Sequence, residues 1–380
     1  LLHMAQIVQS HALSFFHLSA PDLLLGMDYD PQLRNVAGLL AEHPAVVQDG
    51  VRLRKFGQQV IERLGRERVH PSWTVPGGVN AQLDPQAREQ TLEEWPEALA
   101  ILQRTLELWK GTIDAFPDEV ATFSNFPTMY CGTVSPDGAL ELYDGGLRFR
   151  DADGEIVADH VEAADYADYI GEATMSDSYL KAPFYKPLGL AEGTYRVGPL
   201  ARLNVCDRVS TPLADAELQE MRQRLGRVVQ SSFHNHFARL IEALYGMERM
   251  KELLEDPKIL DTKVRAHAGV NDLEGVGIIE APRGTLIHHY KVNDDGAMTW
   301  ANLIVATGHN NLAIRRGVHD VATKFIDGNE IQEGAVNRVS ALVRAFDPCL
   351  SCSTHQFGMA AVRLELRGPD GEVLDVKGTV

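Results

Sequence analysis

Residues 92–116, LEEWPEALAILQRTLELWKGTIDAF, carry the pattern that decides the fold. Their large apolar side chains recur at alternating spacings of three and four, at Leu92, Trp95, Leu99, Leu102, Leu106, Trp109, Ile113 and Phe116. Such a seam predicts one long helix that packs lengthwise against neighbouring helices at a shallow angle. Pro96 is expected near its start, where a missing N–H costs least, and Pro117 is expected to end it.

Two further segments show helical spacing of apolar residues. The first begins at Leu53 and is expected to end at Gly65, because glycine readily adopts the conformation of a helix C-terminus. The second runs from Leu218 to Met247, with Pro257 beyond it. Three long amphipathic helices make a helix bundle the expected core.

Short strand-like runs alternate with turn sequences in the rest of the chain. Turns containing glycine fall at 135–138, 151–154, 293–296 and 369–371, beside strand-like runs at 140–143, 147–150, 285–292, 298–305, 362–366 and 372–376. These runs predict hairpins inserted into one helical body. The expected fold class is therefore α+β and predominantly α, with a long-helix bundle core and inserted β-hairpins.

Composition excludes several classes of partner. The 380 residues contain 36 Lys and Arg against 53 Asp and Glu, a formal net charge of −17. This charge opposes approach to nucleic acid or anionic lipid, and no apolar run reaches the ~20 residues that span a bilayer. The four cysteines are too few for a disulfide scaffold and are typical of a reducing, cytoplasmic compartment.

The stretch richest in chemistry is residues 347–355, DPCLSCSTH. Cys349 and Cys352 are spaced so that both thiolates can bind one metal, and thiolates suit zinc, nickel and iron. A structural zinc site would need another close Cys or His pair, whereas Cys131 and Cys206 are solitary. A redox motif is the other alternative, but no βαβ unit opens at Cys349. Either the fold recruits the solitary cysteines, or further ligands lie in sequence that this chain lacks.

The sequence GVGIIEAPRG, which ends at Gly284, begins like a dinucleotide-binding fingerprint. Glu280 stands where the third glycine belongs and no clear strand precedes the motif, so we expect no nucleotide there. Pro282 and Gly284 instead fix a tight turn that would hold the guanidinium of Arg283 in one direction. An Arg in such a turn is more often a surface ion-pair partner, but Asp347 is its expected partner if the two segments meet.

Two other stretches are expected to be mainly structural. Residues 303–311, LIVATGHNN, predict a buried strand that ends in a polar turn, where Thr307 or Asn310 could hydrogen-bond a small ligand. The loop at residues 70–79 follows the first helix and turns sharply. Packing or surface roles are assigned to the other histidines, including His267, His288 and His289.

Taken together and in this order, these stretches resemble the large subunit of nickel–iron hydrogenases. The resemblance extends from residues 9–12 to His355, and its matching segments are 347–355, 280–284, 303–310 and 70–79. Within the family, the sequence of residues 347–355 and 305–308 is most similar to the cytoplasmic, bidirectional group coupled to NAD(P) or another cofactor.

The resemblance implies a centre of one nickel and one iron held by four thiolates, with cyanide and carbon monoxide on the iron. Cys349 would be a terminal nickel ligand, and Cys352 would bridge nickel and iron. His355 would bind magnesium (iron in some relatives) together with the backbone carbonyl of Leu303. The other implied site residues are Arg283 over the open coordination site, Asp347 behind it, and Pro282 and Thr307 beside the cofactor, with Thr307 donating to a cyanide.

One implied feature has no counterpart in the sequence. The family's other Cys-x-x-Cys, and the acidic residues that help to bind magnesium and pass protons, precede the helix that opens this chain. We therefore expect Leu1 to be a truncation point and the chain alone to be inactive. Residues 1–355 would be one catalytic domain without its N-terminal part. Residues 356–380 would be a C-terminal extension, either a propeptide removed by a maturation protease or a retained hairpin.

The implied reaction is the reversible heterolytic cleavage of H2. It needs a hydride acceptor, which a metal can supply, and a proton acceptor, for which we expect the thiolate of Cys349 because Arg283 rarely loses its proton. Arg283 and Asp347 would then be electrostatic positioners. The chain has no cysteine set for an iron–sulfur cluster, which implies a separate iron–sulfur small subunit. Flavin- and NAD-binding diaphorase subunits are also implied for this group.

Alternatives from other classes stay open. The non-catalytic quinone-site subunit of respiratory complex I shares the implied fold, but that branch lacks the cysteines found here at Cys349 and Cys352. A zinc-binding interaction protein is a second alternative, which metal analysis would separate from a hydrogenase. A hydrogen-sensing relative is a third.

Overall fold

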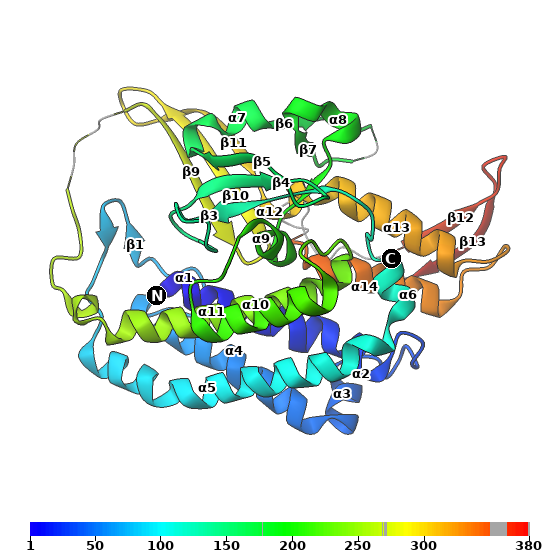
Figure 1. Cartoon of the computed structure of the whole chain (residues 1–380), viewed down its shortest axis with the longest axis horizontal. Coiled ribbons are helices and arrows are strands. Elements are labelled where there is room, and N and C mark those ends of the chain that lie inside the picture. The colour runs from blue at the N-terminus through cyan, green and yellow to red at the C-terminus, as the bar shows by residue number, and fades with distance from the viewer. Residues whose placement is uncertain (177, 268, 270–271, 350–362, 379–380) are drawn as a thin grey trace.

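The computed structural model describes the chain except residues 177, 268, 270–271, 350–362 and 379–380. Long helices form one layer, and short sheets form a second layer above it (Figure 1). The predicted α+β class, with a helical core and inserted hairpins, is confirmed. Cys352 and His355 lie outside the described residues, so their predicted roles stay predictions.

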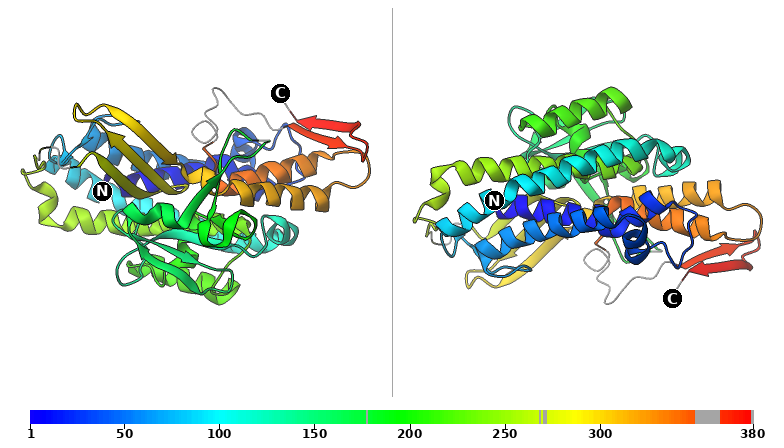
Figure 2. Two further views of the ribbon diagram at one scale, coloured as in Figure 1. Left: turned by 90° about the horizontal axis from the view of Figure 1, so that it is seen from above. Right: turned by 90° about the horizontal axis from the view of Figure 1, so that it is seen from below.

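Four helices form the centre of the helical layer: α1 (Leu2–Ala12), α4 (Pro44–Gly65), α5 (Pro85–Thr112) and α11 (Asn235–Glu255). Each of them contacts two of the others along its length (Figure 2). The seam predicted over residues 92–116 faces this core, where Leu102, Leu106 and Trp109 are at most 1% exposed. Burial of these large side chains is the main reason why the four helices stay together.

Several predicted helix boundaries are wrong. α4 begins at Pro44 rather than at Leu53, although it ends at Gly65 as predicted. α5 begins at Pro85 rather than near Pro96, because Asp84 caps it by accepting a hydrogen bond from the Gln86 N–H (2.9 Å). Pro96 therefore lies inside the helix. The predicted helix over residues 218–247 is in fact two helices, α10 (Pro212–Leu225) and α11. Gly226 separates them with φ at 95°.

The β layer contains two main sheets. One has the strand order β5-β4-β3-β8, in which β3 and β8 are parallel and the other pairs are antiparallel; the other sheet is antiparallel and has the order β11-β10-β9. A second hydrophobic core lies in this layer and includes Cys131, Phe149, Tyr195, Ile287 and Ile304. The strands are β3 (Met129–Val134), β4 (Gly146–Arg150), β5 (Ile156–Val161), β8 (Tyr195–Arg196), β9 (Glu274–Ala281), β10 (Gly284–Val292) and β11 (Met298–Ile304).

Most predicted strands are present, but the run at residues 140–143 is not one of them. Leu140 forms only an isolated bridge to Val134. The Glu141 carboxylate accepts hydrogen bonds from the N–H groups of Leu142 and Tyr143, both at 2.9 Å. A side chain that satisfies the neighbouring backbone in this way competes with a strand ladder.

Within its described residues, the C-terminal part contains three helices and a hairpin. α12 (Ala306–His309) follows β11, and α13 (Asn311–Phe325) packs against α14 (Glu333–Phe346). The predicted strand–turn–strand of the tail is confirmed as β12 (Arg363–Arg367) paired with β13 (Val373–Gly378). Asp375 ties this hairpin to the body by accepting a hydrogen bond from the Ile331 N–H at 2.8 Å.

The remaining described elements are shorter. They are a π-helical turn (Leu13–Ser19), α2 (Ala20–Leu25), α3 (Val36–Glu42), β1 (Thr74–Val75), β2 (Gly78–Val79), α6 (Pro117–Thr122), α7 (Tyr166–Tyr169), β6 (Ile170–Ala173), β7 (Ala182–Tyr185), α8 (Gly189–Glu192) and α9 (Pro199–Val205). Among the described residues, no helix combines the length and the apolar character that a membrane crossing requires. The loop at residues 70–79 contains the β1–β2 hairpin, and residues 264–266 hydrogen-bond to it.

Candidate active site

The turn that carries Arg283 joins β9 to β10, where Ala281 pairs with Gly284. Gly284 has φ at 137° and Gly198 has φ at 104°, conformations that favour glycine. A Cβ on Gly284 would lie 3.0 Å from the Gly198 nitrogen, and a Cβ on Gly198 would lie 3.0 Å from the Arg283 carbonyl oxygen. The Arg283 turn is therefore packed backbone against backbone on the chain that enters α9.

Arg283 meets Asp347, as the sequence predicted. The Arg283 Nε–H donates to the Asp347 carbonyl oxygen at 2.7 Å, and Nε lies 3.3 Å from the carboxylate oxygen Oδ2. Asp347 follows the C-terminus of α14 with φ at 52° and is 3% exposed. Its Oδ2 is buried and accepts no hydrogen bond from the described residues. The guanidinium and an incompletely bonded carboxylate thus face the same small region.

Thr307 meets Cys349, two residues after Asp347. The Cys349 N–H donates to Thr307 Oγ1 at 2.9 Å, and the Cys349 side chain is partly exposed. Accepting this bond leaves the Thr307 hydroxyl with its own proton to donate. Asn310, the alternative ligand-binding residue, is used structurally: its amide pairs with both the N–H and the carbonyl of Val197, at 2.9 and 3.1 Å.

Leu303 differs from its prediction. The stretch that it opens was expected to be a buried strand, but β11 is an edge strand and Leu303 is 47% exposed. Burial begins at Ile304, which is 2% exposed. The sequence pattern alone could not reveal the exposure of Leu303, because an edge strand with one covered face can carry apolar residues on both faces.

A network of charged residues, which the sequence did not predict, supports the Arg283 turn. Arg202 on α9 is 0% exposed and donates to Glu242 on α11 with two N–H groups at 2.6 Å, and to Glu280 on β9 at 2.8 Å. His11 completes the network with a ring nitrogen 2.9 Å from Glu242. The available signal was a charged residue inside each of two apolar stretches, Arg202 and Glu242, since such residues are seldom buried without a partner.

The buried charges of this network have shifted pKa values. Burial alone would raise the pKa of Glu242, but Arg202 and His11 outweigh burial and lower that pKa to about 2. Burial raises the pKa of Glu280, and Arg202 offsets only part of the increase. The pKa values of the two carboxyl groups shift in opposite directions because Arg202 donates two hydrogen bonds to Glu242 and only one to Glu280.

The solitary cysteines do not contribute to a metal site in the part of the chain that the structure describes. Cys131 and Cys206 are both 0% exposed, and burial raises the pKa of each thiol, that of Cys206 to about 11. No group of three or more His, Cys, Asp or Glu side chains suited to a metal occurs among the described residues. Recruitment of these two thiols, one of the alternatives left by the sequence, therefore finds no support.

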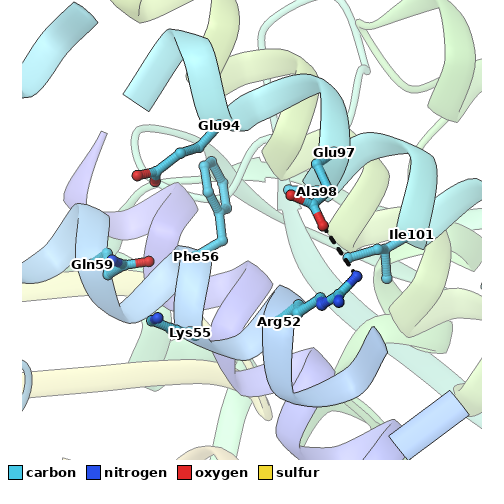
Figure 3. Close-up of a pocket in the computed structure, with 8 residues that line it drawn as sticks. All are labelled: Arg52, Lys55, Phe56, Gln59, Glu94, Glu97, Ala98 and Ile101. Carbon is cyan, nitrogen blue, oxygen red and sulfur yellow. Dashed lines mark hydrogen bonds and ion pairs between the residues drawn. The ribbon is translucent and has the colours of Figure 1, made fainter. Parts of the chain in front are cut away.

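A separate hollow lies between α4 and α5 and contains none of the predicted site residues (Figure 3). The hydrophobic side chain of Phe56 lines it, beside an ion pair of 3.3 Å between Arg52 and Glu97. Both charged side chains are more than half exposed, so the pair contributes little to stability. We assign this hollow no part in the chemistry.

The model of a family described as nickel-dependent hydrogenase matches residues 146–355, more than half of the chain. The chain belongs to this family. The predicted resemblance to the large subunit of nickel–iron hydrogenases is thereby confirmed. The match contains Arg283, Thr307, Asp347 and Cys349, the four residues that the fold brings together.

Individual relatives of this hydrogenase chain agree with the family match. The NAD-reducing hydrogenase HoxS subunit beta of Cupriavidus necator is 38% identical over 98% of this chain and 78% of its own length. A chain of the F420-non-reducing hydrogenase vhu of Methanococcus voltae is 39% identical over 87% of this chain and 78% of its own length.

Solved structures show the same relationship. A crystal structure of an NAD+-reducing [NiFe]-hydrogenase in the H2-reduced state superposes with a TM-score of 0.90 and 42% identity, covering 93% of this chain and 78% of the other. A [NiFeSe]-hydrogenase of Dm. baculatum, with 21% identity, a TM-score of 0.68 and coverage of 93% and 81%, shares the fold.

The residues present fit the metal centre that the family implies. Cys349 offers a partly exposed thiol, the ligand type that nickel and iron favour. Two residues before Cys349, the buried Oδ2 of Asp347 lacks a hydrogen bond within the described ranges and lies 3.3 Å from Nε of Arg283, in a region that could receive a polar group. Such an orphaned oxygen is what a site built around a further charged or polar group would leave when that group is absent.

Proposed function

We propose that this chain is the catalytic large subunit of an enzyme that reversibly and heterolytically cleaves H2, with residues 1–355 as its catalytic domain. The observation that carries the proposal is the contact of Arg283 with Asp347, 64 residues along the chain, just before Cys349, whose N–H donates to Thr307. A thiol, a guanidinium and a carboxylate at one point provide both a proton acceptor and a fixed electrostatic environment.

The proposed ligands divide between described residues and residues outside the described ranges. Cys349 would bind nickel terminally, Cys352 would bridge nickel and iron, and His355 with the Leu303 carbonyl would bind magnesium or iron. Pro282 and Thr307 would contact the iron and its cyanide and carbon monoxide ligands. When bound, the centre would supply the Lewis acidity that polarises the H–H bond.

The chain's own residues would manage the proton. We assign the thiolate of Cys349 as the base that receives one proton of H2, because an arginine side chain such as that of Arg283 is in general a poor base. Asp347 balances the Arg283 charge across 3.3 Å and holds the side chain in place. H2 thus yields two protons and two electrons, and the electrons leave the chain.

The electron partners are proposed from composition and relatives. Four cysteines, two of them buried and two in the metal motif, leave no set for an iron–sulfur cluster, so an iron–sulfur small subunit would take the electrons. Relatives named as NAD-reducing, at 38% and 42% identity, support NAD or NADP as the final acceptor through flavin-containing diaphorase subunits. Such an assembly would work in the cytoplasm.

The C-terminal extension, residues 356–380, bears on maturation. We propose that a dedicated protease acts on it if it is a propeptide, whereas the hairpin contact of Asp375 with Ile331 would favour retention. The intact mass of this chain in active enzyme distinguishes the two outcomes directly.

One experiment tests the proposed function as a whole. The assembled enzyme is purified, nickel and iron are measured per large subunit, and H2-dependent reduction is followed with NAD, NADP and a viologen dye. We expect metal-dependent reduction of the dye and of NAD or NADP. Metal-loaded enzyme that reduces none of them would overturn the proposal, while reduction of the dye alone would overturn the assigned acceptor. Zinc in place of nickel and iron would support the zinc-binding alternative.

A further inference from the structure

Arg202 directs three of its five hydrogen bonds to residues 280–282, just before Arg283, and the other two to Glu242. Besides the two carboxylates, its Nη1–H donates to the Ala281 carbonyl at 2.9 Å and its Nη2–H donates to the Pro282 carbonyl at 3.2 Å. With the three bonds to Glu242 and Glu280, all five donors of the side chain have partners. Two consecutive peptide units of the turn are thus held from one rigid, planar group.

Arg202 is itself held firmly, because α9 is braced at both ends. At its N-terminus the Leu200 N–H donates to the Asn235 side chain at 3.2 Å. At its C-terminal end, carbonyls of residues 203–207 accept hydrogen bonds from four guanidinium groups, those of Arg148, Arg150, Arg222 and Arg227. Cations at this end also complement the helix dipole. The seven-residue helix is therefore a rigid support.

The carboxylates of Glu242 and Glu280 explain how a buried guanidinium can hold the Arg283 turn. A guanidinium at 0% exposure would be costly alone, but Glu242 and Glu280 surround it at 2.6–2.8 Å. Glu280 is anchored in turn by hydrogen bonds to its Oε1 from the Thr285 hydroxyl at 2.7 Å and the Thr133 N–H at 3.1 Å. These contacts fix the strands on both sides of the Arg283 turn.

We propose that Arg202 is a positioning residue for Arg283: by clamping the Ala281 and Pro282 carbonyls, it aims the Arg283 side chain at Asp347. This inference rests on the proposed function for its effect on turnover, but the clamp itself is a property of this chain. It goes beyond the site because Arg202 is assigned no contact with substrate or metal.

The test compares Arg202→Lys with Arg148→Lys in the assembled enzyme. A lysine keeps a cation between the carboxylates but has three donors from one point and cannot hold both carbonyls. Arg148 is the matched control: it is 3% exposed, pairs with Asp159 and Asp207, and donates to one carbonyl at the other end of α9. Its role there is shared with three other guanidinium groups.

The first readout is independent of activity. Amide hydrogen exchange of a peptide over residues 276–287 is expected to quicken about tenfold in Arg202→Lys and to stay unchanged in Arg148→Lys, because only the first change frees the turn. Unchanged exchange in Arg202→Lys would overturn the inference. If that variant does not fold, Arg202→Lys/Glu280→Gln, which leaves one buried cation with one carboxylate, is compared with Glu280→Gln and must meet the same expectation.

The second readout is a double-mutant cycle with Arg283→Lys. Arg202→Lys is expected to lower turnover about 10- to 100-fold with nickel content unchanged, yet to lower it less than twofold further in the Arg283→Lys background. If the losses of turnover in the two single variants multiply in the double variant, Arg202 does not act through Arg283. A wild-type enzyme without H2-dependent activity would overturn the proposed function, and the exchange measurement would still decide whether the clamp exists.

Discussion

Arg283 contacts Asp347 through two of its nitrogens, which a lysine with a single nitrogen could not reproduce. Its Nε–H donates to the Asp347 carbonyl oxygen at 2.7 Å, and its Nη2–H donates to the carboxylate oxygen Oδ1 at 3.5 Å. We expect Arg283→Lys to keep the metal content of the assembled enzyme, because Arg283 is not a proposed ligand. Turnover should fall by about 10²–10³-fold, the scale of losing one preorganised electrostatic group. Parallel assays of H2 oxidation and of nickel per chain measure both.

A surface arginine provides the control for this substitution. Arg52 lies in the hollow between α4 and α5 (Figure 3), is 59% exposed and pairs only loosely with Glu97. Arg52→Lys should leave turnover unchanged. Unchanged H2 oxidation in Arg283→Lys would remove Arg283 from the mechanism, and a large loss of nickel in that variant would make its role structural.

At the scale of elements, the break between α10 and α11 depends on the backbone of one glycine. Gly226 has φ at 95° and ψ at 172°, a region that L-residues rarely adopt. A Cβ there would meet nothing within 4 Å, so backbone strain alone decides the outcome. Gly226→Ala is expected to cost about 1–3 kcal/mol of unfolding free energy, seen as a lower urea midpoint.

Gly111 is a matched glycine with the opposite expectation. It lies in the last turn of α5, and a Cβ added there would also meet nothing within 4 Å. Gly111→Ala should raise stability by about 0.5–1 kcal/mol, because alanine loses less backbone entropy in a helix. Equal effects of the two substitutions would contradict the conformational explanation of the α10–α11 break.

The elements also show what the sequence could predict and what it could not. Local periodicity predicted the buried seam of α5, and turn chemistry predicted the hairpin of β10 and β11. The apolar periodicity predicted one helix that continued through Gly226, although a glycine with positive φ is a common helix terminator. Pairings between distant residues were predictable only where the chemistry was unusual. Arg283 and Asp347 were matched by charge and motif. Arg202 and Glu242, 40 residues apart, each showed only as a charge inside an apolar stretch, which does not identify the partner.

At the scale of the whole molecule, the site lies where the helical core meets the β-layer core. Leu200 and Leu203 of α9 belong to the helical core, and Val197, just before α9, belongs to the other. The Arg283 turn comes from the β layer, and Asp347 comes from the end of a bundle helix. Any loss of global stability that separates the layers should therefore also separate the groups proposed for catalysis.

Buried histidines make that global stability depend on pH. Burial, with a smaller contribution from Arg224, lowers the pKa of His234 to about 4, and burial lowers the pKa of His309 to about 3. Unfolded histidines titrate near 6.5, so between pH 6 and 4 the unfolded chain binds more protons than the folded one. Each of these histidines therefore lowers the unfolding free energy as the pH falls, by roughly 1 kcal/mol per pH unit.

His234→Gln should remove one such contribution. His234 is 4% exposed, and its Nδ1 has no hydrogen-bond partner among the described residues, so the substitution changes mainly proton binding. Between pH 6 and 5, the unfolding free energy of the variant should fall roughly 1 kcal/mol less than that of the wild type. Urea titrations at closely spaced pH values measure this slope.

His319→Gln is the control, since the His319 side chain is 79% exposed, and the pH slope of its unfolding free energy should match that of the wild type. An unchanged slope in His234→Gln would mean that this ring binds protons equally well in the folded and the unfolded chain, and that its burial does not contribute to the pH dependence.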